Sequence, residues 1–530
     1  MADRTRTELS RRRLLTTGGA TAAAAALAPA AAARAATGRP AGPSRAAAPV
    51  DPARLQRWAR DTWTSVLAMT DPGTGFPADN LPASLSSSGR SRYTSPTNVG
   101  GYLWCTVVAR ELGLVGRREC ASRVRRTLET LLQVDHHVPS GMYYNWYDES
   151  DGSVVTTWPD SGDPVVPFVS SVDNGWLGAA LQVVRTAVPE VGALAEPLWE
   201  RMRWDAFYDP RATGPGGLLH GGFYDSPPPE GTAARLGDHL GVGDDVWLTD
   251  HHYDTHVSEA RVAGYLGLVR GQVPASWYYS TWRTFPDGCD WSWQQARPVG
   301  RTRTYEGVEV FEGAYAHHGS LVVPGWGGSM FEELMPDLFV PEARWARRSW
   351  GVNHPAHVRA QVRHGLVDAG YGYWGFSPAS DPFGGYREYG VDAVGLNPDG
   401  YFSDRERTDV DPGFPGCREA SSPSPVFGDG VVTPHASFLA LAYEPERAQA
   451  NLVGLEEDLG AYGDGGFLDA VAVRSGTLAR RHLSLDQAMC LGALGNVLGD
   501  DVLHRAFATV EVQRALRPVM SQEVFGARLG

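Results

Sequence analysis

Apolar residues recur every three to four positions along most of the chain, a spacing typical of amphipathic helices. Over 96–113, for example, Val99, Leu103 and Val107 fall on one helix face, with Ser95-Pro96 before the segment and Gly113 at its end. Regular period-2 strands are scarce. The same criteria predict twelve helices, over 52–70, 96–113, 116–133, 171–187, 190–203, 257–270, 328–338, 342–365, 433–441, 445–458, 484–497 and 500–513. Arranged as hairpins, they predict an all-α fold, an (α/α)6 toroid of six helical hairpins.

The loops between these helices are unusually long and aromatic. The segments 134–170, 205–256, 273–327 and 371–432 hold most of the Trp, Tyr, Gly and Asp residues. Loops of this length are usually functional or disordered, and these are too aromatic for disorder. In a toroid they would gather at one rim and form a cleft; the alternative is surface loops without function. Only 402–426, rich in Asp, Pro and Ser, is predicted to be a flexible insertion.

The N-terminus carries an export pattern. Ser10-Arg11-Arg12-Arg13-Leu14-Leu15 matches a twin-arginine signal, and an Ala-rich run follows to Ala33. A disordered tail or an anchoring helix is the alternative, but the run has too few leucines for a good membrane span. We therefore predict a signal peptide over 1–36, a disordered linker over 37–50 and a single catalytic domain over 51–530. The protein would meet the twin-arginine machinery before maturation, have no membrane anchor and be secreted.

Composition narrows the class of ligand. The net charge of −14 argues against nucleic acid, anionic lipid and strongly acidic polysaccharides, and it permits a neutral substrate. The 17 Trp and 20 Tyr residues favour a sugar ligand, because aromatic rings stack on sugar faces. The five cysteines form no CxxC motif and are interpreted as mostly structural. We expect a monomer without a cofactor.

Four predicted helices begin with a carboxylate beside aromatic or Gly-rich sequence. These are Asp173, which precedes Trp176, then Glu259 with Arg261 two positions on, Glu332, and Asp486. The alternative is purely structural, because acids at helix starts cap the backbone and complement the helix dipole. Either interpretation places these side chains at helix ends.

Other catalytic classes lack their motifs. The sequence has no GxSxG elbow, no P-loop and no HExxH. Histidines occur as neighbours at 136–137, 251–252 and 317–318, and adjacent histidines do not easily ligate one ion, so no metal site is predicted. Paired carboxylates in an aromatic cleft remain, and glycosidic hydrolysis needs such a pair.

An ordered set of short motifs across about 90–500 resembles the glucoamylase-like (glycoamylase) domain, the group that includes the endo-β-1,2-glucanases of glycoside hydrolase family 144. The motifs are Thr94-Ser95-Pro96-Thr97-Asn98-Val99-Gly100, Tyr144-Asn145-Trp146-Tyr147, Val172-Asp173-Asn174-Gly175-Trp176-Leu177, Ser258-Glu259-Ala260-Arg261, Trp326-Gly327-Gly328-Ser329-Met330-Phe331-Glu332, Trp374-Gly375-Phe376-Ser377, Gly466-Phe467-Leu468-Asp469 and Leu483-Ser484-Leu485-Asp486-Gln487. The sequence departs from the family at Glu333, where a Tyr is usual, and at Ala488, where a Gly is usual.

The resemblance implies an (α/α)6 toroid that cleaves or transfers β-glucosidic bonds without a metal. By position, Glu259 corresponds to the general acid and Asp486 to the base that acts on water. The residues expected to hold glucose units are Asp173, Trp176, Arg261, Glu332, Tyr144, Trp146, Trp374 and Asp381.

The sequence thus predicts an exported glycoside hydrolase for a neutral β-glucan, with β-1,2-glucan as the first substrate to test. Two alternatives stay open. A polysaccharide lyase would share the toroid but needs cations against uronic acids, and a glycan-binding protein would share the cleft without catalysis.

Overall fold

The computed structural model describes residues 45, 47–212, 216–237, 245–285, 294, 296–396 and 427–526. The predicted signal peptide, most of the predicted linker and the insertion predicted over 402–426 lie outside these residues. Within the described part of the chain, no helix is both long and apolar enough to cross a membrane.

Helices dominate the fold and fall into two groups by burial. Helices α3, α5 and α14 are buried along most of their length, whereas α2, α4 and α16 bury only one face and are amphipathic. The more buried group is α3 (Pro96–Glu111), α5 (Ser171–Ala187), α7 (Arg261–Val269), α9 (Met330–Leu334), α12 (Pro434–Ala440) and α14 (Ser484–Leu498). Around it lie α2 (Pro52–Met69), α4 (Arg117–Gln133), α6 (Gly192–Arg201), α11 (Trp350–Arg363), α13 (Pro445–Glu457) and α16 (Val510–Gln522).

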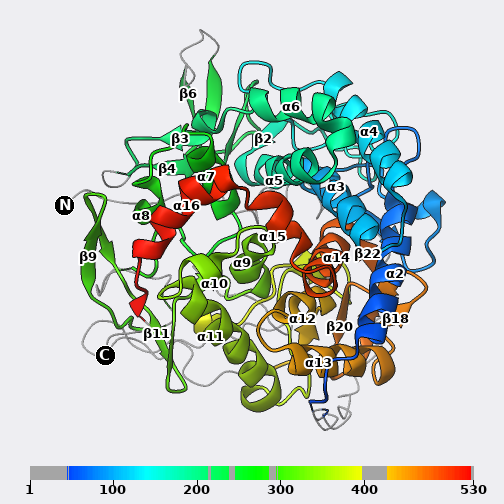
Figure 1. Cartoon of the computed structure of the whole chain (residues 1–530), viewed down its shortest axis with the longest axis vertical. Coiled ribbons are helices and arrows are strands. Elements are labelled where there is room, and N and C mark those ends of the chain that lie inside the picture. The colour runs from blue at the N-terminus through cyan, green and yellow to red at the C-terminus, as the bar shows by residue number, and fades with distance from the viewer. Residues whose placement is uncertain are drawn as a thin grey trace.

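The inner helices pack one against the next around the centre of the molecule (Figure 1). Helix α14 packs against α3, α3 against α5, and α5 against α7; on the other side α14 packs against α12, and α12 against α9. Each inner helix carries one outer helix: α2 packs on α14, α4 on α3, α6 on α5, α16 on α7, α11 on α9 and α13 on α12. The inner helices are therefore shielded from solvent by a second layer.

The prediction of an all-α fold needs correction, because the long loops contain short strands. A four-stranded sheet has the order β2-β5-β7-β6, and two three-stranded sheets have the orders β3-β4-β8 and β17-β20-β21. Their strands are β2 (Phe168–Ser170), β3 (Tyr208–Asp209), β4 (Leu218–His220), β5 (Gly222–Tyr224), β6 (Ala234–Gly237), β7 (Val246–Thr249), β8 (His252–Tyr253), β17 (Val431–Val432), β20 (Ala470–Ala472) and β21 (Thr477–Ala479). Strands of two to four residues are too short to show a period-2 pattern in the sequence.

The remaining strands form two-stranded pairs. These are β1 (Asn80–Pro82) with β22 (Arg481–Leu483), β9 (Thr302–Tyr305) with β10 (Val308–Phe311), β11 (Tyr315–His317) with β12 (Ser320–Val322), β13 (Gly325–Trp326) with β16 (Gly395–Leu396), β14 (Ala379–Ser380) with β15 (Tyr386–Arg387), and β18 (Tyr462–Gly463) with β19 (Gly466–Phe467).

Three predicted helices are divided in the structure. The segment 342–365 forms α10 (Glu342–Trp345) and α11, and 328–338 forms α9 followed by a 3-10 turn at Pro336. The segment 500–513 forms α15 (Val502–Phe507) and the start of α16. A short helix, α8 (Trp277–Ser280), was not predicted.

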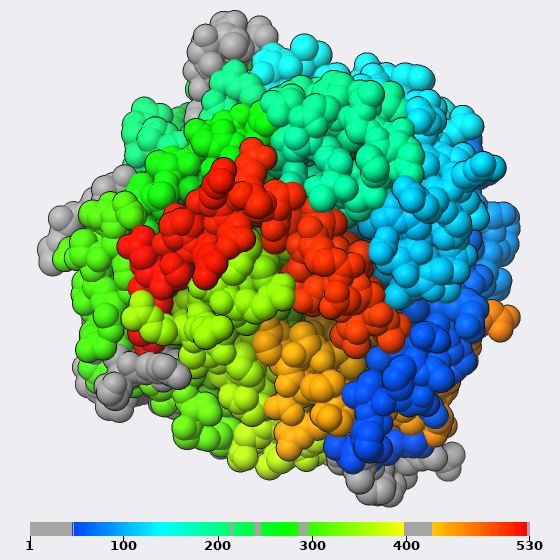
Figure 2. Space-filling model, viewed as in Figure 1, coloured from blue at the N-terminus to red at the C-terminus, as the bar shows by residue number. Residues whose placement is uncertain are grey.

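The C-terminal helices α15 and α16 cross one face of the molecule, where Figure 2 shows them in red. They lie near the C-terminal ends of inner helices: Gln182 of α5 donates to Thr509 at 3.4 Å, and the side-chain oxygen of Asn496 in α14 accepts from the Leu503 backbone N–H at 2.9 Å. Just after α16, the fully buried Glu523 pairs with the fully buried Arg283, which lies 240 positions earlier in the chain. The Gln182 and Asn496 contacts thus place α15 and the start of α16 at the ends where α5 and α14 terminate, whereas Glu523 lies 3.6 Å from His256, just before the start of α7.

The long loops lead into the opposite, N-terminal ends of inner helices. The loop 134–170 runs directly into α5, and 205–256, 273–327 and 371–432 each end within a few residues of α7, α9 and α12. The N-terminal turns of the inner helices therefore lie where the aromatic loops end.

Candidate active site

The N-terminal turns of the inner helices are linked into one polar group. Thr97 of α3 donates to Asp173 of α5 (2.6 Å), and Trp176 of α5 donates to Glu259, which lies just before α7 (2.6 Å). The Glu259 backbone N–H donates to Glu332 of α9 (2.6 Å). On the other side, Nδ1 of His435 in α12 lies 3.2 Å from Oδ2 of Asp486 in α14. The four carboxylates predicted at helix starts therefore do lie at helix starts, and neighbouring inner helices connect them.

Glu259 is held by two neighbours. Its carboxylate accepts from the indole N–H of Trp176, and only 3% of the residue is exposed. Helix α7 begins at Arg261, four residues later than predicted, because hydrogen bonds of the i to i+3 type shape residues 258–263. Trp176 is itself fully buried and packs edge-on against Trp104 at 6.4 Å. In this structure Trp176 positions Glu259 and does not offer its ring face to a sugar.

Every N–H group of the Arg261 guanidinium donates to a partner within the protein. It forms a bidentate ion pair with Glu342 (2.8 Å for both contacts) and donates to the backbone carbonyls of Ser258, Glu332 and Glu333. Its guanidinium also lies over Trp350, 4.4 Å from the ring centroid. Because these bonds occupy all five N–H groups of the guanidinium, Arg261 holds the start of α9 and leaves no donor for a ligand.

Beneath Glu332, a buried charge network surrounds His354. Its Nδ1 lies 2.6 Å from Glu333, and its Nε2 lies 3.3 Å from Glu342 and 3.7 Å from Asp337. Burial alone would lower the pKa of His354, but these three carboxylates outweigh it and raise the pKa to about 10. Burial likewise opposes ionisation of Glu342, yet Arg261 lowers its pKa to about 2. Glu333 is thus part of an ion network under the site.

We expect His354→Gln to lower the free energy of unfolding at neutral pH by about 3–5 kcal/mol, because it leaves buried carboxylates without their cation. The pKa of His354 is higher in the folded than in the unfolded protein. The stability that charged His354 contributes is therefore complete below the unfolded pKa of 6.5 and is lost as the pH rises through about 10. Urea unfolding across this range should show a fall in stability for the wild type and a flatter dependence for His354→Gln. The exposed His318, changed to Gln, serves as control; equal pH slopes in all three proteins would contradict the assignment.

Asp486 shares its site with Asp469. Burial raises the pKa of Asp486 to about 7, and a hydrogen bond from Asp469 opposes that rise. Burial and the neighbouring Asp486 raise the pKa of Asp469 well above its ordinary value. Among the described residues, Asp469 Oδ1 and Asp486 Oδ2 are buried and accept no hydrogen bond, because Nδ1 of His435 bonds with the Thr433 hydroxyl at 2.8 Å instead. The pair is therefore satisfied when one carboxyl carries a proton. The directions of these pKa shifts fit a dyad in which Asp469 holds the proton and donates it in a hydrogen bond to Asp486.

Asp79 and His435 complete the surroundings of this dyad. The Asp79 side chain accepts from Asn98 at 2.9 Å, and its backbone carbonyl accepts from the Ser484 N–H at 2.8 Å. Burial raises the pKa of Asp79, and its charge adds to the rise at Asp486. Burial lowers the pKa of His435 to about 4, so its ring is neutral at physiological pH.

A cluster of aromatic rings lies next to Asp79. Tyr93, Trp146 and Trp158 meet edge-on at centroid distances of 5.2–5.5 Å, and the Tyr93 carbonyl accepts from the Asp79 N–H at 2.9 Å. Trp146 and Tyr93 are partly exposed. Tyr144 is also partly exposed, but its hydroxyl donates to Asp225. The partly exposed rings beside the carboxyl group suit a sugar-stacking surface.

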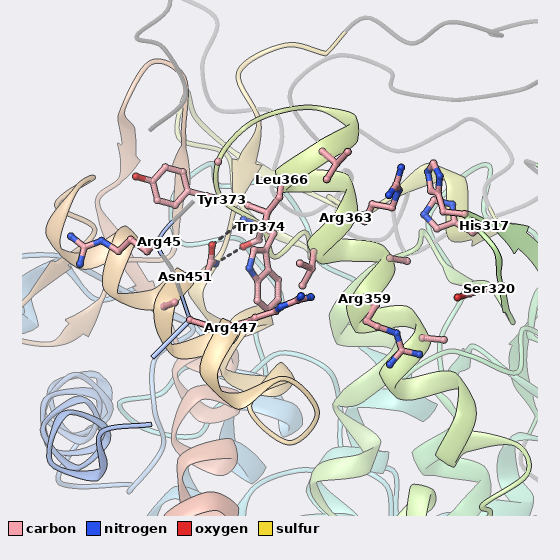
Figure 3. A pocket seen from close by; sticks show the side chains of 18 of the residues that line it. Arg45, His317, Ser320, Arg359, Arg363, Leu366, Tyr373, Trp374, Arg447 and Asn451 are labelled. Atoms are coloured by element: carbon pink, nitrogen blue, oxygen red, sulfur yellow. Dashed lines mark hydrogen bonds between the residues drawn. The ribbon is translucent and has the colours of Figure 1, made fainter. Parts of the chain in front are cut away.

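Two predicted binding residues lie elsewhere. Trp374 lines a groove of about 560 Å³ between the outer helices α11 and α13, where it exchanges backbone hydrogen bonds with Asn451 (Figure 3). Asp381 caps the turn between β14 and β15, accepting from the Phe383 N–H and pairing with Arg387 at 3.0 Å. Its neighbour Ser380 donates its backbone N–H to Asp469 at 2.7 Å. Asp381 thus shapes the turn next to Ser380, the residue that contacts Asp469, and Trp374 belongs to the outer groove.

Two protein-family models match parts of this chain. Residues 298–511 match the glycoamylase family model, described as "Putative glucoamylase", and residues 57–211 match a model described as a protein of unknown function, DUF3131. This confirms the resemblance to the glucoamylase-like domain. This chain is also 26% identical, over 293 residues, to the cyclic β-(1,2)-glucan synthase NdvB of Rhizobium meliloti (strain 1021). That match covers 52% of this chain but only 8% of the synthase.

Solved structures share the fold. The endo-β-1,2-glucanase of Chitinophaga pinensis, in complex with sophorotriose and glucose, has a TM-score of 0.61 at 14% identity, covering 89% of this chain and 98% of its own. The endo-β-1,2-glucanase of Talaromyces funiculosus, in complex with sophorose, has a TM-score of 0.56 at 12% identity, covering 91% and 94%. This chain therefore has the fold of these glucanases over nearly all of its described length.

The sequence interpretation missed several residues of this site. Asp469 ends the motif Gly466-Phe467-Leu468-Asp469, which precedes Asp486 in the chain. This motif is the signal that could have suggested a second acid beside Asp486. Asp79 precedes β1 and follows no periodic pattern, so no signal in the sequence marks it. His435 starts a helix behind Pro434 and resembles an ordinary helix start.

Proposed function

We propose that this chain is an (α/α)6-toroidal glycoside hydrolase that cleaves a neutral β-glucan, with β-1,2-glucan as the first candidate. The observation that carries the proposal is the placement of Glu259 and of the Asp469–Asp486 dyad at N-terminal turns of the inner helices. The succession of inner helices, each covered by an outer one, supports the toroid. The names of the related glucanases and of the glucan synthase support the linkage.

The proposed reaction uses the two carboxyl groups in separate roles. Glu259 gives a proton to the glycosidic oxygen as the bond to the anomeric carbon breaks. Asp486 takes a proton from water as the water oxygen forms the new bond to that carbon. A base with a pKa of about 7 is half ionised near neutral pH, where its proton-accepting strength is also high. The hydrogen bond from Asp469 would keep Asp486 ionised until it accepts this proton.

The other site residues have supporting roles in this proposal. Asp173, held by Thr97 at the start of α5, is half-buried and can accept from a sugar hydroxyl. The partly exposed rings of Tyr93 and Trp146 would stack on glucose rings next to Asp79, and the buried Trp158 would hold them in place. Glu332 and Arg261 would act through Glu259, which Glu332 positions by accepting its backbone N–H.

The structure offers less support for the alternatives. A lyase needs a cation against the uronic carboxylate, and Arg261 has no N–H left for one. A glycan-binding protein without catalysis would not need a carboxyl dyad tuned toward neutral pH. Neither alternative uses the dyad.

Product analysis with a panel of purified neutral glucans tests the function. The mature chain is incubated with β-1,2-, β-1,3-, β-1,4- and β-1,6-linked glucans, and soluble oligosaccharides are separated by chromatography. Release of β-1,2-linked oligosaccharides alone supports the full proposal. Release from another polymer retains the hydrolase and replaces the linkage, whereas no release, with oligosaccharide binding intact, supports the binding protein.

Export by the twin-arginine route is part of the proposal and rests on Arg11 and Arg12 in the first residues of the chain. Replacing both with Lys should keep the chain inside the cell. Export of that variant at the wild-type level would contradict this route.

A further inference from the structure

Three side chains of metal-ligand type meet on a small sheet away from the dyad. Asp209 lies on β3, His220 on β4 and His252 on β8, and these strands are neighbours in the order β3-β4-β8. His220 and His252 are register partners across the antiparallel pair. One potential ligand atom from each of the three residues lies within 4.8 Å of the other two. The sheet therefore brings together two imidazoles and one carboxylate that are far apart in sequence.

The distances fit a shared ion. Asp209 Oδ2 lies 3.3 Å from Nε2 of His252 and 3.7 Å from Nε2 of His220. Bonds of about 2.0–2.1 Å to a tetrahedral Zn²⁺ place neighbouring ligand atoms about 3.3 Å apart. Small side-chain shifts would bring all three atoms to that spacing.

The surroundings of His220 set its tautomer. Its Nδ1 lies 2.6 Å from the Thr249 carbonyl oxygen, which only accepts, so Nδ1 carries the proton and Nε2 presents its lone pair toward Asp209. Metal-bound histidines are commonly oriented by such a bond from the second ring nitrogen to a backbone carbonyl. The other carboxylate oxygen of Asp209 accepts from the Arg211 N–H at 3.0 Å. Oδ2 shares a hydrogen bond with Nε2 of His252 at 3.3 Å, and a bound ion would replace that bond.

Two arginines lie near the same carboxylate. Arg235 approaches Asp209 Oδ2 at 3.7 Å and Arg211 approaches Oδ1 at 3.8 Å. Their side chains are 54% and 79% exposed, so both can turn into solvent when a cation binds. The three ligand-type residues, in contrast, are anchored on paired strands.

We propose that Asp209, His220 and His252 bind one divalent first-row transition ion, with Zn²⁺ as the best match. Two imidazole nitrogens and one carboxylate oxygen favour such an ion over Ca²⁺ or Mg²⁺, which prefer oxygen ligands. A water molecule would complete the tetrahedron. His252 lies seven positions before Glu259 in the same connecting segment, so the ion would fix the base of the segment that carries the proposed acid. Its role is structural, and it is independent of the proposed hydrolysis.

Metal titration of the EDTA-treated mature chain tests the site. We expect one Zn²⁺ per chain by calorimetry, a rise in Tm on adding Zn²⁺, and a visible d–d absorption band on adding Co²⁺. His252→Gln is the main variant, because His252 is partly exposed and its replacement should fold. It should bind Zn²⁺ at least about tenfold more weakly and lose the Co²⁺ band. Asp209→Asn should behave in the same way.

His318→Gln is the matched control, because His318 belongs to a second group of possible ligands with His317 and Asp368. Circular dichroism confirms that each variant is folded; if Asp209→Asn does not fold, His252→Gln decides. Wild-type affinity in His252→Gln, or loss of binding in His318→Gln alone, would overturn the assignment. Absence of the Co²⁺ band in the wild type would also overturn it. None of these readouts depends on glucan cleavage.

Discussion

Glu259→Gln should lower kcat/KM on the susceptible glucan by about 10²–10⁴-fold, the usual effect of removing a general acid. The amide has nearly the shape of the acid, and its oxygen can still accept from Trp176, so the fold and the neighbouring Glu332 contact should be retained. What is lost is the proton for the leaving oxygen. Initial rates of oligosaccharide release, measured with oligosaccharide affinity and Tm, separate this chemical loss from a structural one.

Glu309→Gln is the matched control, because it makes the same chemical change at an exposed position on β10. It should retain wild-type rates. If Glu259→Gln keeps more than about a tenth of the activity, a factor well below general-acid effects, Glu259 is not the acid. If the loss appears only with a fall in affinity or in Tm, Glu259 has a structural or binding role.

Asp486→Asn should abolish turnover to a similar extent, and Asp469 should set the pH at which Asp486 works. Asp469→Ala removes the hydrogen bond that favours ionised Asp486, so the pKa of Asp486 rises above about 7. Because a base must be ionised to accept a proton, the acidic limb of the pH–kcat profile should move to higher pH. Activity near pH 6 should fall more than activity near pH 8, values that lie roughly one unit on either side of that pKa.

Asp469→Asn provides the comparison for this prediction. Its amide can still donate to Asp486, so its acidic limb should stay near that of the wild type. Measured kcat–pH profiles for the three proteins test the dyad. A limb that moves to lower pH in Asp469→Ala, or that does not move at all, would contradict the proposed direction of the hydrogen bond.

Much of the helical framework was predictable because its signals are local. The starts of α3 and α5 follow from Ser95 and Ser170, whose side chains accept from backbone N–H groups three residues later. The division between α10 and α11 is different. Glu342 at the start of α10 is held by Arg261, 81 positions away. The pattern of residues within 342–365 carries no information about such a distant partner.

The candidate site was predictable to the extent that it consists of acids at helix starts. Those acids fall at the starts of inner helices because Glu259, Glu332 and Asp486 adjoin apolar runs, a pattern that the sequence displays. The function of Arg261 was not predictable, because the count of its occupied N–H groups depends on Glu342 and on two backbone carbonyls of α9. The metal-type group was missed for the same reason, since Asp209, His220 and His252 meet only through strand pairing.

The pairing of Glu523 with Arg283 has a consequence for biosynthesis. A ribosome makes Arg283 240 residues before its partner, and the fully buried guanidinium has no carboxylate from Glu523 until Glu523 itself has emerged. Burying such a cation without its partner is strongly unfavourable. The N-terminal helices can pack during translation, but the region around Arg283 can settle only after Glu523 has left the ribosome. A nascent chain that stops short of Glu523 thus retains an unfinished interior around Arg283.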